Sequence, residues 1–278
     1  MRKISFIGAG NMARALVGGL LKAGHDASLI HAADPFAGAR ESLAEMGVTV
    51  SDNNAATAQG ADVIVLAVKP QVLTEVLRDM ATELPADALL VSIVAGMPLQ
   101  TITDALGTAA EPAPNPKMAV VRCMPNTPAL LGQGITGMYA NATVSDAQKR
   151  QAEALAGAAG RWVWVPSEAA IDSVTAVSGS GPAYFFYLME AMIEAGVELG
   201  LERSLAAELV VATATGAAAM AEQPGADPAV LRQNVTSPGG TTERALALFD
   251  TAKLNSGIRT ALAGAAARSA ELAREFGK

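Results

Sequence analysis

The sequence predicts an α/β protein, with an N-terminal Rossmann-type doubly wound domain over residues 1–165 and an all-α helical domain over residues 166–278. Three observations support this prediction. Short apolar runs alternate with helix-like segments in the first half, a glycine-rich turn separates the first run from the first helix, and alanine-rich helical segments replace the strand-like runs after Pro166. The 278 residues, 51% of them hydrophobic, suffice for two separate cores.

The strands are expected in the first half of the chain. Residues 3–8 should form the first strand, residues 11–23 a helix ended by Gly24, and residues 28–34 the second strand. Further strands are expected within residues 61–70, 88–96, 118–124 and 134–141, and the sheet should end near residues 161–165. Their continuous apolar runs are typical of strands covered on both faces. Three prolines in residues 108–117 indicate a surface connection.

Long helices are expected at residues 182–199, 205–222 and 258–276. The first of them carries Tyr184, Phe185, Phe186, Leu188, Met189 and Met192, which would coat most of one helix with apolar surface. Either a monomer core or a homodimer interface could bury that surface. The apolar run 209–220 is bounded by glutamates and is too short to cross a bilayer, so we expect no membrane segment.

Composition narrows the class of partner. The net charge of −7 and the lack of a basic run argue against nucleic-acid binding, which leaves a small molecule as the expected partner. Cys123 is the single cysteine, so no intramolecular disulfide can form, and a reducing cytoplasm is expected. With only His25 and His31 present, we expect no zinc site and no other metal site.

A dinucleotide-binding motif lies between the first strand and the first helix. Gly8, Gly10 and Ala13 form a G-x-G-x-x-A pattern, in which the glycines allow a tight turn and close approach of a pyrophosphate. Asp34 lies 26 residues after Gly8, where a carboxylate would bind the adenosine ribose of NAD. Alternatively, Asp34 belongs only to a turn, and backbone amides or Arg40 meet the extra phosphate of NADP. The sequence leaves both readings open.

The rest of the chain suggests a substrate that needs little acid catalysis. His31 lies in the expected second strand and His25 just before it, and no lysine occurs between Lys149 and Lys253, so histidine-based and lysine-based dehydrogenase sites are disfavoured. The segment 236–243, TSPGGTTE, combines two glycines with hydroxyls before a predicted helix and can present amides to an anion. A cyclic imine with a carboxylate would suit such a site, because protonation of its nitrogen lets a hydride add readily to the adjacent carbon.

Taken in order, six blocks resemble the pyrroline-5-carboxylate reductase family over essentially the whole chain. They are FIGAGNMA at 6–13, AVKP at 67–70, VSIVAG at 91–96, RCMPNTPAL at 122–130, AVSGSGPAYFF at 176–186 and TSPGGTTE at 236–243. The resemblance implies NAD(P)H-dependent reduction of (S)-1-pyrroline-5-carboxylate to L-proline, with NADP favoured over NAD. It also implies a homodimer formed by the helical domain, with decamers as a further assembly, and an active site between the cofactor of one subunit and the helical domains of the pair.

The resemblance also assigns site residues. Thr242 would give its hydroxyl to the ring nitrogen as the catalytic residue, and the substrate carboxylate would meet Ser237, Gly239, Gly240, Thr241 and Lys69. The cofactor would contact Gly8, Gly10, Asn11, Met12, Asp34, Asn54, Ala67, Val68, Lys69, Pro70, Met124, Pro125, Asn126 and Thr127. Ser178 and Ser180 are lesser candidates, and Cys123 is expected to be a buried apolar residue.

Two other functions remain open at this point. One is a reductase of a related cyclic imine or of a ketimine amino acid. The other is a catalytically silent dinucleotide-binding scaffold that uses its apolar helices to bind partners, although this leaves the glycine and hydroxyl block without a purpose.

Overall fold

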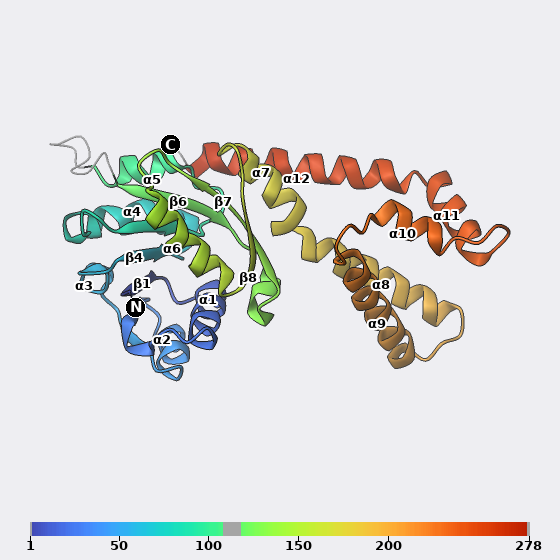
Figure 1. Cartoon of the computed structure of the whole chain (residues 1–278), viewed down its shortest axis with the longest axis horizontal. Coiled ribbons are helices and arrows are strands. Elements are labelled where there is room, and N and C mark those ends of the chain that lie inside the picture. The colour runs from blue at the N-terminus through green and yellow to red at the C-terminus, as the bar shows by residue number, and fades with distance from the viewer. Residues whose placement is uncertain (1, 108–117, 277–278) are drawn as a thin grey trace. The chain divides into compact units, whose positions relative to one another are not determined.

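The computed structural model describes residues 2–107 and 118–276, and the chain forms two compact units (Figure 1). Unit 1 comprises Met1–Ser180 together with Ala265–Lys278, and unit 2 comprises Gly181–Gly264. The division therefore falls after Ser180 rather than after residue 165, and the last part of the chain returns to the first unit. The connection expected at residues 108–117 lies outside the described residues.

Unit 1 is built on a sheet with the strand order β3-β2-β1-β4-β5-β6-β7-β8 among the described residues. The strands are β1 (Ile4–Ile7), β2 (Ile30–Ala33), β3 (Thr49–Ser51), β4 (Val63–Leu66), β5 (Leu89–Ser92), β6 (Ala119–Met124), β7 (Gly134–Ala140) and β8 (Gly160–Trp164). The expected doubly wound domain is present, because the chain leaves β1 for β2 and β3 on one side and continues from β4 on the other.

Two features of the sheet differ from the expectation. β6 and β7 pair antiparallel, whereas all other neighbours are parallel. Only the short 3₁₀ helix η3 (Thr127–Leu131) lies between these two strands, and a parallel pair would need a longer crossover connection. The three-residue strand β3 was not foreseen, because so short a run gives no periodic signal.

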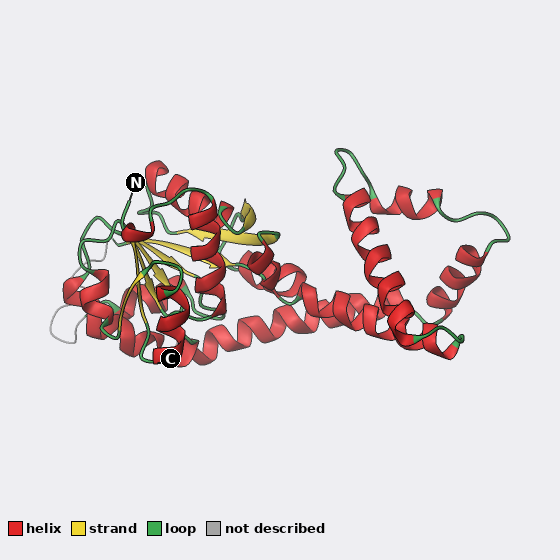
Figure 2. Ribbon diagram, turned by 90° about the horizontal axis from the view of Figure 1, so that it is seen from below, coloured by secondary structure: helices red, strands yellow, loops and turns green. Residues whose placement is uncertain are grey.

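Helices cover both faces of the sheet (Figure 2). The helical elements of unit 1 are α1 (Asn11–Lys22), η1 (Ala27–Leu29), α2 (Ala37–Ala44), α3 (Asn54–Ala58), α4 (Pro70–Met80), η2 (Ala81–Glu83), α5 (Leu99–Ala105), η3, α6 (Asp146–Gly157), α7 (Ala170–Val174) and the π-helical turn η4 (Thr175–Gly179). Phe6 and Val65 belong to the core cluster with α1 and α6, whereas Ile7 and Leu66 belong to the cluster with α4 and α5. This alternation follows from the two-residue period of a strand.

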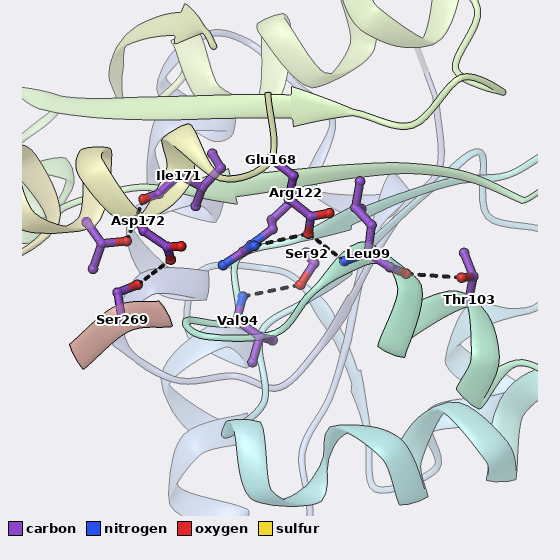
Figure 3. Close-up of polar contacts among 10 residues, drawn as sticks. Ser92, Val94, Leu99, Thr103, Arg122, Glu168, Ile171, Asp172 and Ser269 are labelled. Carbon is purple, nitrogen blue, oxygen red and sulfur yellow. Dashed lines mark hydrogen bonds and ion pairs between the residues drawn. The ribbon is translucent and has the colours of Figure 1, made fainter. Parts of the chain in front are cut away.

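A buried ion pair holds Glu168, in the segment that follows β8, against Arg122 on β6 (Figure 3). Arg122 on β6 is 4% exposed, and its Nη1 lies 3.0 Å from Oε1 of Glu168. The same Glu168 oxygen accepts a hydrogen bond from the Leu99 amide at 2.7 Å, and Asp172 accepts one from the Ser269 hydroxyl at 2.7 Å. β6, α5, α7 and the end of the last helix are therefore joined by charged and hydroxyl groups, which satisfies the buried guanidinium.

Unit 2 is helical, as expected. It contains α8 (Gly181–Glu198), α9 (Arg203–Ala221), α10 (Pro228–Asn234), α11 (Thr241–Thr251) and the first part of α12 (Leu254–Phe276). Its apolar side chains are largely exposed within a single chain; Phe185 on α8 is 65% exposed and Leu209 on α9 is 50% exposed. A surface of this kind is expected to be covered by another molecule.

Among the helices of the described residues, α9 is long and apolar enough to cross a membrane. From the sequence we expect no membrane span, because the apolar run begins at Leu209. The helix instead begins at Arg203 and has 19 residues. Length and composition therefore do not exclude a span here. Apolar helices that pack against another subunit have the same composition.

The packing of unit 1 leads to a stability prediction at Gly19. A β-carbon at this α1 position would collide with the carbonyl oxygen of Ala158, so we expect Gly19→Ala to destabilise unit 1 by about 1–3 kcal/mol. Gly38→Ala in α2 is the matched control, because no heavy atom lies within 4 Å of its added carbon and alanine favours the helix.

Urea unfolding followed by tryptophan fluorescence measures this effect, since both tryptophans, Trp162 and Trp164, lie on β8 of unit 1. The midpoint should fall for Gly19→Ala and hold or rise for Gly38→Ala. Equal midpoints for the two variants would show that α1 and the end of α6 do not approach so closely.

Candidate active site

The glycine turn fits between the ends of two neighbouring strands. Gly8 has a φ of +103°, and a β-carbon there would lie 2.6 Å from the carbonyl oxygen of Ala67. The Gly8 amide donates a hydrogen bond to the carbonyl oxygen of Ala33 at 2.8 Å, and the Ala67 amide donates one to the carbonyl oxygen of Ile7 at 2.7 Å. Both the dihedral angle and the contact require glycine at this position. The turn thus lies at the switch point of the sheet, where ligands bind in doubly wound folds.

The start of α1 is open for an anion. Gly10 is its N-cap residue and provides no side-chain cap, and nothing lies within 4 Å of the position that a β-carbon would take. Asn11 is exposed and Met12 is partly buried, whereas Ala13 is buried against the sheet. An uncapped helix start beside an open glycine is the arrangement that receives a pyrophosphate, so the residues present fit a dinucleotide.

Both oxygens of the Asp34 carboxylate accept hydrogen bonds from nearby backbone amides. Oδ2 accepts a hydrogen bond from the Ala9 amide at 2.9 Å, and Oδ1 accepts one from the Phe36 amide at 2.9 Å. Arg40 donates from Nη1 to the carbonyl oxygens of Asp34 and Pro35, at 2.6 and 3.0 Å. Asp34 therefore braces the glycine turn and closes the turn into α2. This geometry favours the second of the two readings that the sequence left open.

Several other predicted cofactor residues lie at the same edge of the sheet. Ala67 and Val68 follow β4 directly, Lys69 is the N-cap of α4, and Pro70 is its first residue. The Lys69 side chain is exposed, and proline suits a first helical position because its nitrogen has no hydrogen to donate. Asn54 is the first residue of α3, which follows β3. The carboxyl ends of parallel strands bring these residues to one edge.

The segment Met124–Thr127 begins at the last residue of β6, and the side chain of its Asn126 forms hydrogen bonds within the protein. Asn126 is buried; its Nδ2 donates to the Ser178 carbonyl at 3.2 Å, and its Oδ1 accepts from the Ile135 amide at 2.9 Å. A β-carbon on Gly179 would lie 2.5 Å from Cε of Met124. Asn126 thus ties the π-helical turn η4 to the end of β6. Sequence reasoning named Ser178 only as a hydroxyl and missed the role of its carbonyl.

Cys123 is buried, and His31 on β2 is partly buried. Cys123 is buried on β6, and burial raises the pKa of its thiol to about 12, so the thiol stays protonated and inert as expected. Burial, followed by the positive charge of Lys3, lowers the pKa of His31. Within residues 2–107 and 118–276, no group of three or more His, Cys, Asp or Glu side chains is placed to hold a metal ion.

The glycine and hydroxyl block forms a loop that ends at the start of α11 in unit 2. Gly239 has a φ of +70°, and its amide donates to Oε2 of Glu243 at 2.8 Å. The Gly240 amide donates to the Ser237 carbonyl at 3.0 Å. The two glycine amides that were expected to bind an anion are therefore engaged inside the loop.

The first amides of α11 are the available donors of this loop. Gly240 is the N-cap residue and provides no side-chain cap. No protein acceptor for the amides of Thr241 and Thr242, nor a partner for the Thr242 hydroxyl, occurs among the described residues. Free N–H groups at a helix start attract an anion.

A glycine turn at the switch point of a doubly wound sheet, with an open helix start, defines the class of dinucleotide-dependent oxidoreductases. Residues 3–96 match the family described as NADP oxidoreductase, coenzyme F420-dependent, and residues 168–272 match the one described as pyrroline-5-carboxylate reductase dimerisation. The predicted start of the helical domain, residue 166, lies close to the start of this second match.

Full-length relatives give the family itself. A pyrroline-5-carboxylate reductase of Pseudomonas aeruginosa is 50% identical, with 99% of this chain and 98% of the relative covered. One of Haemophilus influenzae is 42% identical, with 98% of each covered. The chain belongs to the pyrroline-5-carboxylate reductase family, as its six blocks predicted, and it is an NADP-dependent oxidoreductase by family.

Solved structures agree with this assignment. A pyrroline-5-carboxylate reductase from Coxiella burnetii superposes with a TM-score of 0.89 at 39% identity, and 98% of each chain is covered. A pyrroline carboxylate reductase of Plasmodium falciparum with NADP bound gives a TM-score of 0.85 at 28% identity, again with 98% of each chain covered. The predicted fold class, a Rossmann domain followed by a helical dimerisation domain, is confirmed.

The hydrogen bonds of Asp34 lead to a prediction about cofactor binding. Asp34→Ala removes the acceptor that braces the glycine turn, so binding of NADPH and of NADH should weaken together, by about tenfold, which is about 1.4 kcal/mol and close to the value of one hydrogen bond to a charged group. The ratio of the two affinities should stay nearly constant. Fluorescence titration of each cofactor measures both quantities.

Asp26→Ala is the matched control, because Asp26 accepts from the Ser28 amide and hydroxyl in a similar turn beside η1. It should leave both affinities unchanged. A selective gain in NADPH affinity for Asp34→Ala would instead place the carboxylate on the ribose.

Proposed function

We propose that this chain catalyses the NAD(P)H-dependent reduction of (S)-1-pyrroline-5-carboxylate to L-proline, the last step of proline biosynthesis. The observation that carries the proposal is the loop before α11, where a helix start without a side-chain cap follows a glycine in the left-handed region. Such a loop suits a small carboxylate, and it occurs in a chain that belongs to a reductase family of this name over its full length.

The residues of the chain then have simple roles. The reduced nicotinamide supplies the hydride. The amides of Thr241 and Thr242 bind the substrate carboxylate, and the hydroxyl oxygen of Thr242 accepts a hydrogen bond from the protonated ring nitrogen. Ser237 and the two glycines shape the loop, and the exposed Lys69 adds positive charge at the cofactor edge of unit 1. Orientation and one hydrogen bond suffice for an imine that is already protonated.

Glu243 has a further part in this loop. Its carboxylate accepts from the Gly239 amide at 2.8 Å, so a carboxylate of the chain already occupies one donor of the glycine segment. This hydrogen bond holds the loop in shape and leaves the helix-start amides of Thr241 and Thr242 for the substrate. A negative charge near a helix start is favourable, so the bond also stabilises α11.

NADPH is the cofactor that we propose for this chain. Both oxygens of Asp34 accept from backbone amides, which leaves the carboxylate less able to receive ribose hydroxyls. Arg40 lies against the carbonyls of Asp34 and Pro35 and brings a positive charge to the end of β2, where the adenosine ribose binds in this fold. The remaining cofactor contacts are proposed at the residues that the resemblance assigns.

The chain forms a homo-oligomer through its helical region, which matches the dimerisation family. We propose that the unit is a homodimer and that five dimers can associate further. The exposed apolar residues of α8 and α9 support burial of this surface between subunits. We also propose a cytoplasmic location, in keeping with a single buried thiol that forms no disulfide.

The first experiment is a spectrophotometric assay of cofactor oxidation. Purified protein is mixed with racemic pyrroline-5-carboxylate and NADPH, then NADH, with piperideine-6-carboxylate as the six-membered control. We expect oxidation that is specific to the five-membered ring and faster with NADPH. Faster turnover of the larger ring would indicate a related cyclic-imine reductase, and cofactor binding without any oxidation would indicate the silent scaffold.

Thr242 provides the mutational test. Thr242→Ala removes the acceptor for the ring nitrogen, so kcat should fall by about 100-fold, as for loss of one positioned hydrogen bond in a transition state, while NADPH affinity stays unchanged. Thr251→Ala, at the other end of α11, is the control, because its hydroxyl only donates to the Ala247 carbonyl. Unchanged steady-state kinetics for Thr242→Ala would remove this residue from the mechanism.

A further inference from the structure

Unit 1 contains a cavity of about 370 Å³ at the amino ends of its strands, which we call the amino-edge cavity. Its floor is apolar and buried, and consists of Ile4 at the start of β1, Val63 at the start of β4, Leu20 on α1 and Leu155 on α6. The volume falls in the range of about 300–1,000 Å³ that small-molecule sites occupy. The cavity lies at the opposite edge of the sheet from the glycine turn, about 13 Å away over the four residues from Ile4 to Gly8 at about 3.3 Å per residue.

The rim of the cavity is basic. Arg2, His25, Arg150 and Gln151 line it, and no acidic side chain does so within the described residues. The positive charge of this rim contrasts with the net charge of the whole chain, which is −7. A basic rim with low-dielectric walls attracts an anion from solution.

The rim side chains are positioned to different degrees. Arg2 is held on both sides, because its guanidinium lies against the side-chain amide of Gln151 and its carbonyl oxygen lies 3.0 Å from Nε2 of His25. Arg150 lies one helical position before Gln151 on α6, and its guanidinium has no hydrogen-bond or ion-pair partner in the described part of the chain. One guanidinium is thus fixed and a second is free to bind a ligand.

The aliphatic floor and the arginines of the rim indicate which class of ligand the cavity can bind. A guanidinium presents parallel N–H donors that match the two oxygens of a carboxylate. Four aliphatic side chains beneath it favour an apolar body and disfavour a molecule with several charges. We propose that the amino-edge cavity binds an organic monocarboxylate with an aliphatic or aromatic body, and that Arg150 binds its carboxylate while Arg2 lies beside it. This site is separate from the proline-forming site and does not depend on that function.

Octanoate is the probe that tests this proposal, with octanamide as its neutral counterpart of equal length. Isothermal titration calorimetry of the full-length protein should detect octanoate in the millimolar range or tighter and much weaker octanamide. Arg150→Gln should weaken octanoate by about tenfold, as expected for loss of a charge-assisted hydrogen-bond pair. Arg2→Gln should weaken it as well.

Lys149→Gln is the matched control, because it removes the same charge one residue away on α6 at a position that does not line the cavity. It should change octanoate affinity less than twofold. NADPH affinity, measured in parallel, should be equal in all variants and shows that each has folded. Octanoate binding that is unchanged in Arg150→Gln, equal binding of octanamide, or no binding at all would each overturn the proposal.

Discussion

The close approach of the glycine turn to the end of β4 is the constraint on which the cofactor side of the molecule depends. Gly8 lies so near the Ala67 carbonyl that any β-carbon would collide, and its left-handed backbone excludes other residues in any case. This approach brings the start of α1 and the segment after β4 to one place. The same edge then receives Asp34 from β2 and Asn54 from α3, because neighbouring parallel strands end together.

Hydrogen bonds between polar or charged side chains and the backbone give both candidate ligand sites their shape. Asp34 accepts two amides around the glycine turn, Asn126 bridges two backbone groups beyond β6, and Glu243 accepts the Gly239 amide in the loop before α11. In each case a polar side chain satisfies backbone groups that irregular structure leaves without partners. Among the described residues, the first amides of α1 and α11 have no backbone acceptor, and such positions suit anionic ligands.

The sequence predicted the strands and the long helices closely, because continuous apolar runs and alanine-rich segments signal them directly. It also gave the location of the glycine turn. It did not give the direction of β7, which depends on the length of the connection, nor the partners of Asp34, which come together only when β2 lies beside β1. The two compact units divide after Ser180, because Gly179 and Ser178 pack against residues more than 50 positions away, and no local pattern records such contacts.

The return of the last helix to unit 1 affects the order in which the chain can fold during synthesis. Ser269 donates a hydrogen bond to Asp172, and Leu272 lies against Gly96, so these contacts need residues that are made after all of unit 2. Unit 2 is a single continuous segment. Its synthesis is therefore complete before that of unit 1, although unit 2 starts later in the chain. The cofactor-binding unit can therefore acquire its final contacts only after all of unit 2 has been synthesised, in contrast to proteins whose first domain is complete first.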